Sequence, residues 1–438
     1  MPKTFYIDTL GCAKNDYDSE VLASGLVSLG CVPVSGPEDA DILIVNTCGF
    51  IESAKVESIE HIFSMAEYKG QHKKLVVTGC LSQRYHEELV KEIPEVDLFA
   101  GVNDYEALPA LLVADEAAVD CVTGEPEDVL PYRNRLMPEG VHTSILKIAE
   151  GCDNYCTFCI IPKIRGKYRS KRMEDVLREA EFMASQGVRE LVLIAQDTSC
   201  YGIDLYGEYK LPELLHRLNE VDGIEWIRLM YVYDNAITDE LIDAIAECDK
   251  VCNYIDMPIQ HISDHVLRLM GRRSTKASIL KTINKLRDRI PDVRIRTTLL
   301  VGSPGETGAD FDELIDFVQK CKLDRVGVFA YSEEEDTPAA KMGPKVPAGI
   351  AEARRDTVMA VQQEVSLERN AGMIGHVYEV IVDEVTEDGI CLGRTRYDAP
   401  EIDNEVSFTS IVDHEPGDIA MVRIDEAYEY DIVGEEVF

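Results

Sequence analysis

The chain carries the sequence Cys152-Asp153-Asn154-Tyr155-Cys156-Thr157-Phe158-Cys159 directly after the apolar run 145–149. A short loop with three thiolates can hold an iron–sulfur cluster, and a four-iron cluster with three protein ligands keeps one iron open for an outside ligand. Two alternatives are a zinc knuckle and three unrelated buried thiols. Structural zinc takes four ligands, usually in two pairs, and His142 is the only obvious local fourth. The loop therefore favours a reactive cluster.

Three more cysteines follow strand candidates in the first part of the chain. The strands are expected at residues 5–10, 42–46 and 75–78, with helices between them, which is a parallel α/β pattern. The cysteines are Cys12, Cys48 and Cys80, with 35 and 31 residues between them, about one βαβ unit of roughly 30 residues each. Because ligands bind beyond the carboxyl ends of parallel strands, these thiols are expected to converge on a second cluster. The alternative is that some of them are buried core cysteines.

The other seven cysteines do not have this placement and are interpreted as structural. They are Cys31, Cys121, Cys200, Cys248, Cys252, Cys321 and Cys391.

A second alternating series begins near residue 145. Six strands are expected, at 145–149, 191–196, 226–232, 254–259, 294–301 and 326–331. With helices between them, they correspond to six of the eight units of a TIM-like barrel, and the three-cysteine loop follows the first strand, where such folds place their chemistry. Gly302 and Gly305 follow the fifth strand. They either let the backbone approach a small ligand closely or form a tight turn.

The pattern changes again after a proline-containing break at 344–347 and a connecting helix expected at 351–369. Short strands are expected at 377–382, 390–394, 405–408, 419–424 and 431–433, which is typical of a small antiparallel β-barrel. The predicted fold class is therefore α/β with three domains. They are an N-terminal parallel α/β domain at 1–120, a partial (β/α)6 TIM-like core with the connecting helix at 138–369, and a barrel at 371–438.

Composition supports a reduced, intracellular protein. The 438 residues are 45% hydrophobic, enough for two or three cores, and no run of 18 apolar residues or signal peptide is found. We expect a cytoplasmic protein without membrane contact. An odd total of thirteen cysteines fits metal ligation and free thiols better than a disulfide framework.

Charge is concentrated in the C-terminal barrel. Residues 371–438 hold eighteen acidic and three basic side chains, a net charge of −15, whereas the remaining 370 residues carry −22. Such a module should repel RNA and attract a basic protein, although the acidity of the whole chain, −37, is an alternative reason. The run 163–172 has six basic residues in ten. Contact with RNA is one interpretation of this run. The others are that it faces a carboxylate of the substrate, a carboxylate of a cofactor or solvent, since a charge run is usually a solvated face, so RNA contact is expected to be secondary at most.

Several motifs together resemble one known family. The cysteine loop, with Phe158 before its last cysteine, is similar to the signature of the radical S-adenosylmethionine (SAM) enzymes. With a three-cysteine N-terminal domain and a terminal barrel called TRAM, the whole chain resembles the methylthiotransferases. The segments 11–15 (GCAKN), 46–54 (NTCGFIESA), 159–162 (CIIP) and 398–403 (DAPEID) are similar to the branch that modifies an aspartate of small-subunit ribosomal protein S-twelve.

The resemblance implies two [4Fe-4S] clusters, SAM and an electron donor. Cys152, Cys156 and Cys159 would hold the cluster that cleaves SAM to a radical, and Cys12, Cys48 and Cys80 would hold the cluster that carries the sulfur. One SAM would methylate that sulfur, and a second would supply the radical that removes hydrogen from the aspartate β-carbon. Beyond the cluster ligands, no catalytic side chain is implied.

Three residues are candidates for SAM contact. The resemblance places Phe158 against the adenine, with simple loop packing as its alternative. It also places Gly302 and Gly305 beside SAM.

Two other functions stay open. One is methylthiolation of an adenosine in transfer RNA. The other is a non-catalytic iron–sulfur or zinc scaffold whose acidic barrel recruits a basic partner.

Overall fold

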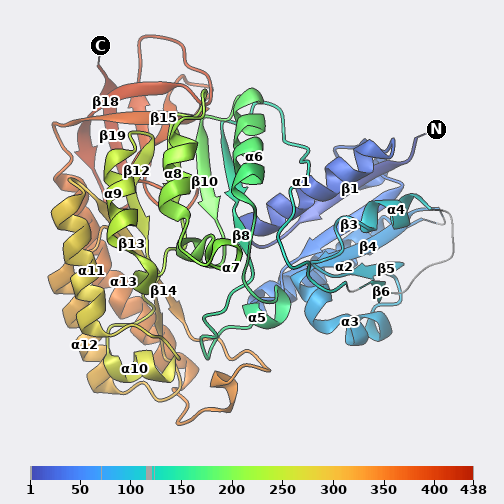
Figure 1. Cartoon of the computed structure of the whole chain (residues 1–438), viewed down its shortest axis with the longest axis horizontal. Coiled ribbons are helices and arrows are strands. Elements are labelled where there is room, and N and C mark those ends of the chain that lie inside the picture. The colour runs from blue at the N-terminus through green and yellow to red at the C-terminus, as the bar shows by residue number, and fades with distance from the viewer. Residues whose placement is uncertain (1, 71, 115–120, 123, 438) are drawn as a thin grey trace.

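The computed structural model describes residues 2–70, 72–114, 121–122 and 124–437, which form three successive units (Figure 1). The last residues of the expected first domain, 115–120, lie outside the described residues, and so does the side chain of Cys121. Among the described residues, every helix is too short or too polar to cross a lipid bilayer.

The N-terminal unit is a parallel sheet, as predicted. Its described strands are ordered β2-β1-β3-β4-β5-β6. They span Val32–Pro33 (β2), Thr4–Thr9 (β1), Ile42–Thr47 (β3), Lys74–Gly79 (β4), Leu98–Ala100 (β5) and Cys121–Val122 (β6). The helices are α1 (Ala13–Ser28), α2 (Glu52–Glu67), α3 (Cys80–Glu92) and α4 (Leu108–Val113). β6 pairs with β5, so the sheet continues past residue 120.

The central strands of this sheet end together. Thr9 pairs with Asn46, and Asn46 pairs with Thr78, so the residues that follow β1, β3 and β4 lie at one edge. Every residue of β3 is buried, which fits a strand covered on both faces by helices.

The core unit has the expected arrangement of parallel strands and helices. Its described strands are ordered β14-β13-β12-β11-β10-β7. They span Arg325–Ala330 (β14), Arg294–Val301 (β13), Val251–Asp256 (β12), Trp226–Leu229 (β11), Glu190–Ile194 (β10) and Thr143–Lys147 (β7). Helices α6 (Met173–Ser185), α8 (Leu211–Asn219), α9 (Asp239–Glu247), α10 (Asp264–Leu269), α11 (Lys276–Arg289) and α12 (Gly308–Cys321) connect them. In Figure 1, α11 and α12 lie on the side opposite the N-terminal unit.

Short elements beside the first core strand carry the cysteine loop and the basic run. They are β8 (Ala149–Glu150), α5 (Ile161–Ile164), β9 (Arg169–Ser170) and α7 (Ile203–Tyr206). β8 and β9 pair with each other, and α5 lies beside the N-terminal unit in Figure 1.

The C-terminal unit is a closed barrel that follows the long helix α13 (Ala348–Ala371). Its strands are β15 (Val377–Val385), β16 (Cys391–Thr395), β17 (Glu405–Thr409), β18 (Ile419–Ala427) and β19 (Asp431–Glu436). The barrel is confirmed, with one difference from the expected antiparallel pattern. β17 and β19 pair in parallel because β18, which lies between them in the sequence, reverses the chain before β19 closes the barrel.

Candidate active site

The N-terminal cysteines lie where the sequence places them, at the aligned ends of three strands. Cys12 is the N-cap of α1, Cys48 follows β3 and Cys80 begins α3. Gly11 and Gly79, which precede two of them, have φ angles of +99° and +100°, a region that side chains disfavour. A Cβ on Gly11 would lie 2.7 Å from the Cys48 Cβ, and one on Gly79 would lie 2.4 Å from the Thr47 carbonyl oxygen. The loops are therefore packed directly against one another.

The three N-terminal thiols differ in their exposure to solvent. Cys80 is buried, Cys48 is half-buried and Cys12 is exposed. Burial, together with the nearby Cys80 and Cys12, raises the pKa of Cys48 to about 11. Burial also raises the pKa of Cys80. Buried thiols of this kind become thiolates when a metal centre supplies compensating positive charge, and the exposed Cys12 leaves one side of the trio open.

The second trio lies on the loop after β8. Cys152 and Cys156 are buried and Cys159 is half-buried. Burial raises the pKa of Cys152 to about 11 and that of Cys159 to about 12, and their neighbouring thiols add to both shifts. The Asn154 side-chain amide donates a hydrogen bond to the Cys152 Sγ at 3.4 Å. This loop therefore also offers thiols that would need a positive centre in order to ionise.

Both trios fit an iron–sulfur cluster by the chemistry of their donors. In the described part of the chain, no three His, Cys, Asp or Glu side chains converge tightly enough to hold a single metal ion. A cluster has a different requirement, because each thiolate binds its own iron. Three neighbouring thiols, twice in one chain, fit that requirement.

One of the candidate SAM-contact residues, Phe158, borders a small cavity, and the chain between the two candidate glycines borders it as well. Phe158 lines this cavity of about 10 Å³ together with Ser303 and Pro304, which lie between the two candidate glycines. A Cβ on Gly302 would overlap Ala351, and one on Gly305 would approach Leu269 to 2.6 Å. The bare faces of both glycines thus pack against protein. Contact of these three residues with SAM stays a prediction.

Sequence reasoning missed the polar residues around the second trio. Asp197, three residues after β10, accepts hydrogen bonds from the Asn154 amide at 2.7 Å and the Ser199 hydroxyl at 2.5 Å. The Cys200 thiol also donates to Asp197, at 3.2 Å, so this cysteine lies near the loop. Beside them, both amide atoms of Gln196 are buried without a hydrogen-bond partner. Their position after the second core strand was the available signal.

The basic run is not the solvated face that its charge pattern predicted. Arg165 is 2% exposed, Arg169 is 7% exposed and Lys171 is fully buried. That expectation is wrong for these three side chains because buried carboxylates pair with them. Arg165 pairs with Asp18 of the N-terminal unit and Glu150 of the core, Arg169 pairs with Glu150, and Lys171 pairs with Glu179. Lys163, Lys167 and Arg172 are exposed.

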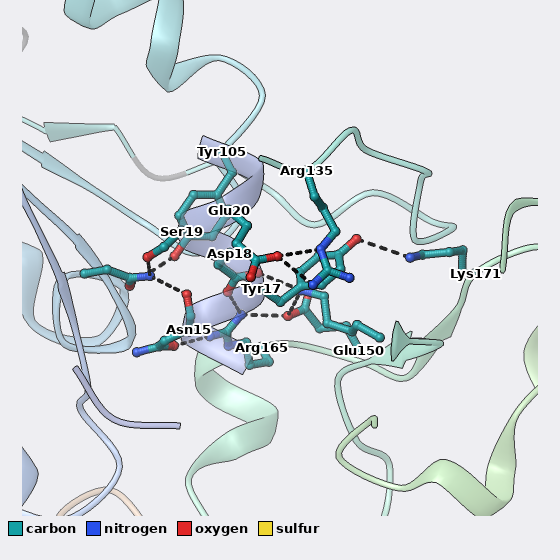
Figure 2. A network of polar contacts seen from close by, with 12 residues as sticks. Asn15, Tyr17, Asp18, Ser19, Glu20, Tyr105, Arg135, Glu150, Arg165 and Lys171 are labelled. Atoms are coloured by element: carbon teal, nitrogen blue, oxygen red, sulfur yellow. Dashed lines mark hydrogen bonds and ion pairs between the residues drawn. The ribbon is translucent and has the colours of Figure 1, made fainter. Parts of the chain in front are cut away.

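Figure 2 shows the buried network that Arg165 and Lys171 enter. The Arg165 guanidinium contacts Asp18 at 2.6 Å and Glu150 at 2.7 Å, and Lys147 contacts the same two carboxylates. A neighbouring group pairs Arg135 with Glu20 and Glu179, and Lys171 with Glu179. Two sets of ion pairs thus bind α1 to the core.

Comparison with protein families places known domains on all three units. Residues 4–101 match the uncharacterized protein family UPF0004, residues 146–318 match the radical SAM superfamily, and residues 374–437 match the TRAM domain.

Solved structures of low sequence identity share the fold. The radical SAM methyltransferase TsrM from Kitasatospora setae, with cobalamin and a [4Fe-4S] cluster bound, is 15% identical with a TM-score of 0.58 and covers 77% of each chain. The cobalamin-dependent SAM radical enzyme OxsB is 13% identical with a TM-score of 0.54, over 82% of this chain and 56% of that one.

Relatives of much higher identity match the chain from end to end. The ribosomal protein uS12 methylthiotransferase RimO of Clostridioides difficile (strain 630) is 48% identical over 99% of this chain and 98% of the relative. RimO of Clostridium tetani is 46% identical over 99% and 98%. RimO of Desulforamulus reducens is 48% identical over 98% of each. With its radical SAM core and TRAM barrel, the chain therefore belongs to the RimO family of radical SAM methylthiotransferases.

Proposed function

We propose that this chain transfers a methylthio group to the β-carbon of an aspartate in ribosomal protein uS12. The observation that carries the proposal is the presence of two separate trios of thiols in a chain whose end-to-end relatives are named uS12 methylthiotransferases. An iron–sulfur cluster and SAM belong to the radical SAM superfamily. The second cluster, on Cys12, Cys48 and Cys80, is part of the proposal.

The side chains of this protein hold and orient the reacting groups. Cys152, Cys156 and Cys159 would bind the cluster that, with SAM, supplies a radical able to remove hydrogen from carbon, and the N-terminal trio would bind the cluster that supplies sulfur. Asn154 holds the second loop by donating hydrogen bonds to Cys152 and Asp197. Phe158 lines a small cavity between this loop and the segment Ser303–Pro304. No proton donor is required for a C–H step of this kind.

The charge of the chain supports a protein substrate rather than RNA. The barrel has a net charge of −15 and should attract a basic ribosomal protein. In the basic run, Arg165, Arg169 and Lys171 are buried in ion pairs and cannot reach phosphates. We propose that RNA contact is secondary, and that the reaction takes place in the cytoplasm with a cellular electron donor.

The test offers both substrates to the reconstituted chain with SAM and a reductant. The protein uS12 is offered both free and within the small ribosomal subunit. Mass spectrometry should find that one aspartate of uS12 has gained one methylthio group in place of one hydrogen. Transfer RNA should be unchanged. The triple variant C12A/C48A/C80A should still cleave SAM without forming this product. A modified adenosine in transfer RNA would favour the alternative substrate, and absence of SAM cleavage would favour a non-catalytic scaffold.

A further inference from the structure

One buried arginine connects the two cysteine trios. Arg165 lies six residues after Cys159, at the C-terminal end of α5, yet its guanidinium reaches the N-terminal unit. Nη2 donates to the Cys80 Sγ at 3.4 Å and to the Asn15 Oδ1 at 2.9 Å. Asn15 is itself three residues after Cys12. The arginine thus touches one candidate cluster ligand directly and the segment that carries another.

The other edge of the guanidinium is held by carboxylates from both units. Nη1 donates to Asp18 on α1 at 2.6 Å and to Glu150 at 2.7 Å, and Glu150 lies two residues before Cys152 (Figure 2). A planar guanidinium can hold such a fork of acceptors rigidly, whereas a lysine ammonium cannot reproduce its geometry. The orientation of the Nη2 group toward Cys80 is therefore fixed by both units.

The local charges leave a positive excess beside Cys80. Asp18 and Glu150 are contacted by three cations, Arg165, Lys147 and Arg169. Three cations against two carboxylates leave one positive charge, and Arg165 is the cation that contacts the sulfur. Hydrogen bonds to ligand sulfurs and nearby positive charge both favour the more negative, reduced state of an iron–sulfur cluster.

We propose that Arg165 is a positioning residue that raises the reduction potential of the auxiliary cluster through its hydrogen bond to Cys80. This inference rests on the proposed second cluster and adds a residue of the radical SAM core to its surroundings. It also gives a physical reason for burying a basic side chain from the run 163–172. The guanidinium of Arg165 would then connect the two cluster sites, through its buried contacts with Cys80 and Glu150.

The test measures the reduction potential of the auxiliary cluster alone. The parent is the full-length chain carrying C152A/C156A/C159A, reconstituted with iron and sulfide, so that only the N-terminal trio can hold a cluster. R165Q, R165K and R135Q are added to this parent, and each is titrated while the reduced cluster is followed by electron paramagnetic resonance. Arg135 is a matched control because it is a buried arginine of the same interface with carboxylate partners.

R165Q should keep its iron and shift to a lower potential, R165K should shift less, and R135Q should stay at the parental value. An unchanged potential in R165Q, or an equal shift in R135Q, would overturn the role of Arg165. If R165Q loses its iron, R165K decides, since a lower potential supports the role and a parental potential overturns it. Absence of iron in the parent would overturn the cluster assignment itself, and the role of Arg165 with it.

Discussion

Replacing Glu334 with alanine should open the interface between the N-terminal unit and the core. Glu334 lies on the loop after β14 and is 3% exposed. Its carboxylate accepts hydrogen bonds from the Glu52 backbone N–H and the Arg84 guanidinium, both at 3.0 Å, and Lys55 lies at 3.3 Å. Arg84 also donates to the Gly49 carbonyl, next to Cys48. This single carboxylate therefore holds the loop that carries a candidate cluster ligand.

The free-energy cost of E334A follows from the buried charge that loses its partner. The Arg84 side chain is 5% exposed, so E334A strands a buried charge. Removing one partner of such a pair costs about 3 kcal/mol or more. At about 1.4 kcal/mol for each factor of ten, local opening should become roughly 10²-fold more frequent.

Hydrogen exchange of the Cys48 amide reports this opening, because its hydrogen bond to the Ser58 hydroxyl at 3.0 Å keeps both partners in E334A. In E334A that amide should exchange roughly 10²-fold faster. The control is E333A, which removes a neighbouring surface pair with Lys345 whose side chains are 56% and 40% exposed, and which should leave the exchange rate near that of the parent. Equal exchange in E334A and the parent, or equal acceleration in both variants, would refute the reasoning.

Three further predictions concern stability and ligation. Burial lowers the pKa of His261 to about 4 from its ordinary 6.5. The folded state therefore resists protonation of this ring, and the free energy of unfolding should fall by about 2 kcal/mol between neutral pH and pH 5. Urea unfolding of H261Q should lack this part of the pH dependence. R394A removes one of two buried arginine partners of Glu190, between the barrel and the core, and leaves Arg228 in place. It should lower the unfolding midpoint in denaturant by the equivalent of about 2 kcal/mol, whereas R423A, at an exposed pair, should not change it. C252A should keep the full iron content on colorimetric analysis, since Cys252 is buried among apolar side chains; loss of iron would show that Cys252 is a ligand.

The positions of the six candidate ligands were predictable because they follow from local pattern. A cysteine directly after a strand of a parallel sheet lies at the carboxyl edge, whatever the rest of the fold does. For the same reason, the alternation of strands and helices predicted the core, and the series of short strands predicted the C-terminal barrel. The parallel pairing of β17 with β19 was missed, since barrel closure depends on contacts that strand patterns do not contain.

The burial of side chains in the basic run 163–172 was not predictable from its charge pattern. Arg165 is buried because Asp18 approaches it from 147 residues away in the sequence, and a one-dimensional pattern carries no signal for that pairing. The position of Asp197 after the second core strand was a usable signal, but its contact with Asn154 was not predictable, because that contact joins the loops after two separate core strands. Burial of charge is decided by partners rather than by the run itself.

The most direct test of the account is the iron and sulfide content of three reconstituted chains. The parent should bind about eight irons, as two four-iron clusters. C12A/C48A/C80A and C152A/C156A/C159A should each bind about four. A parent with about four irons, or an N-terminal triple variant that keeps the parental content, would contradict the claim that two separate trios of thiols each hold a cluster.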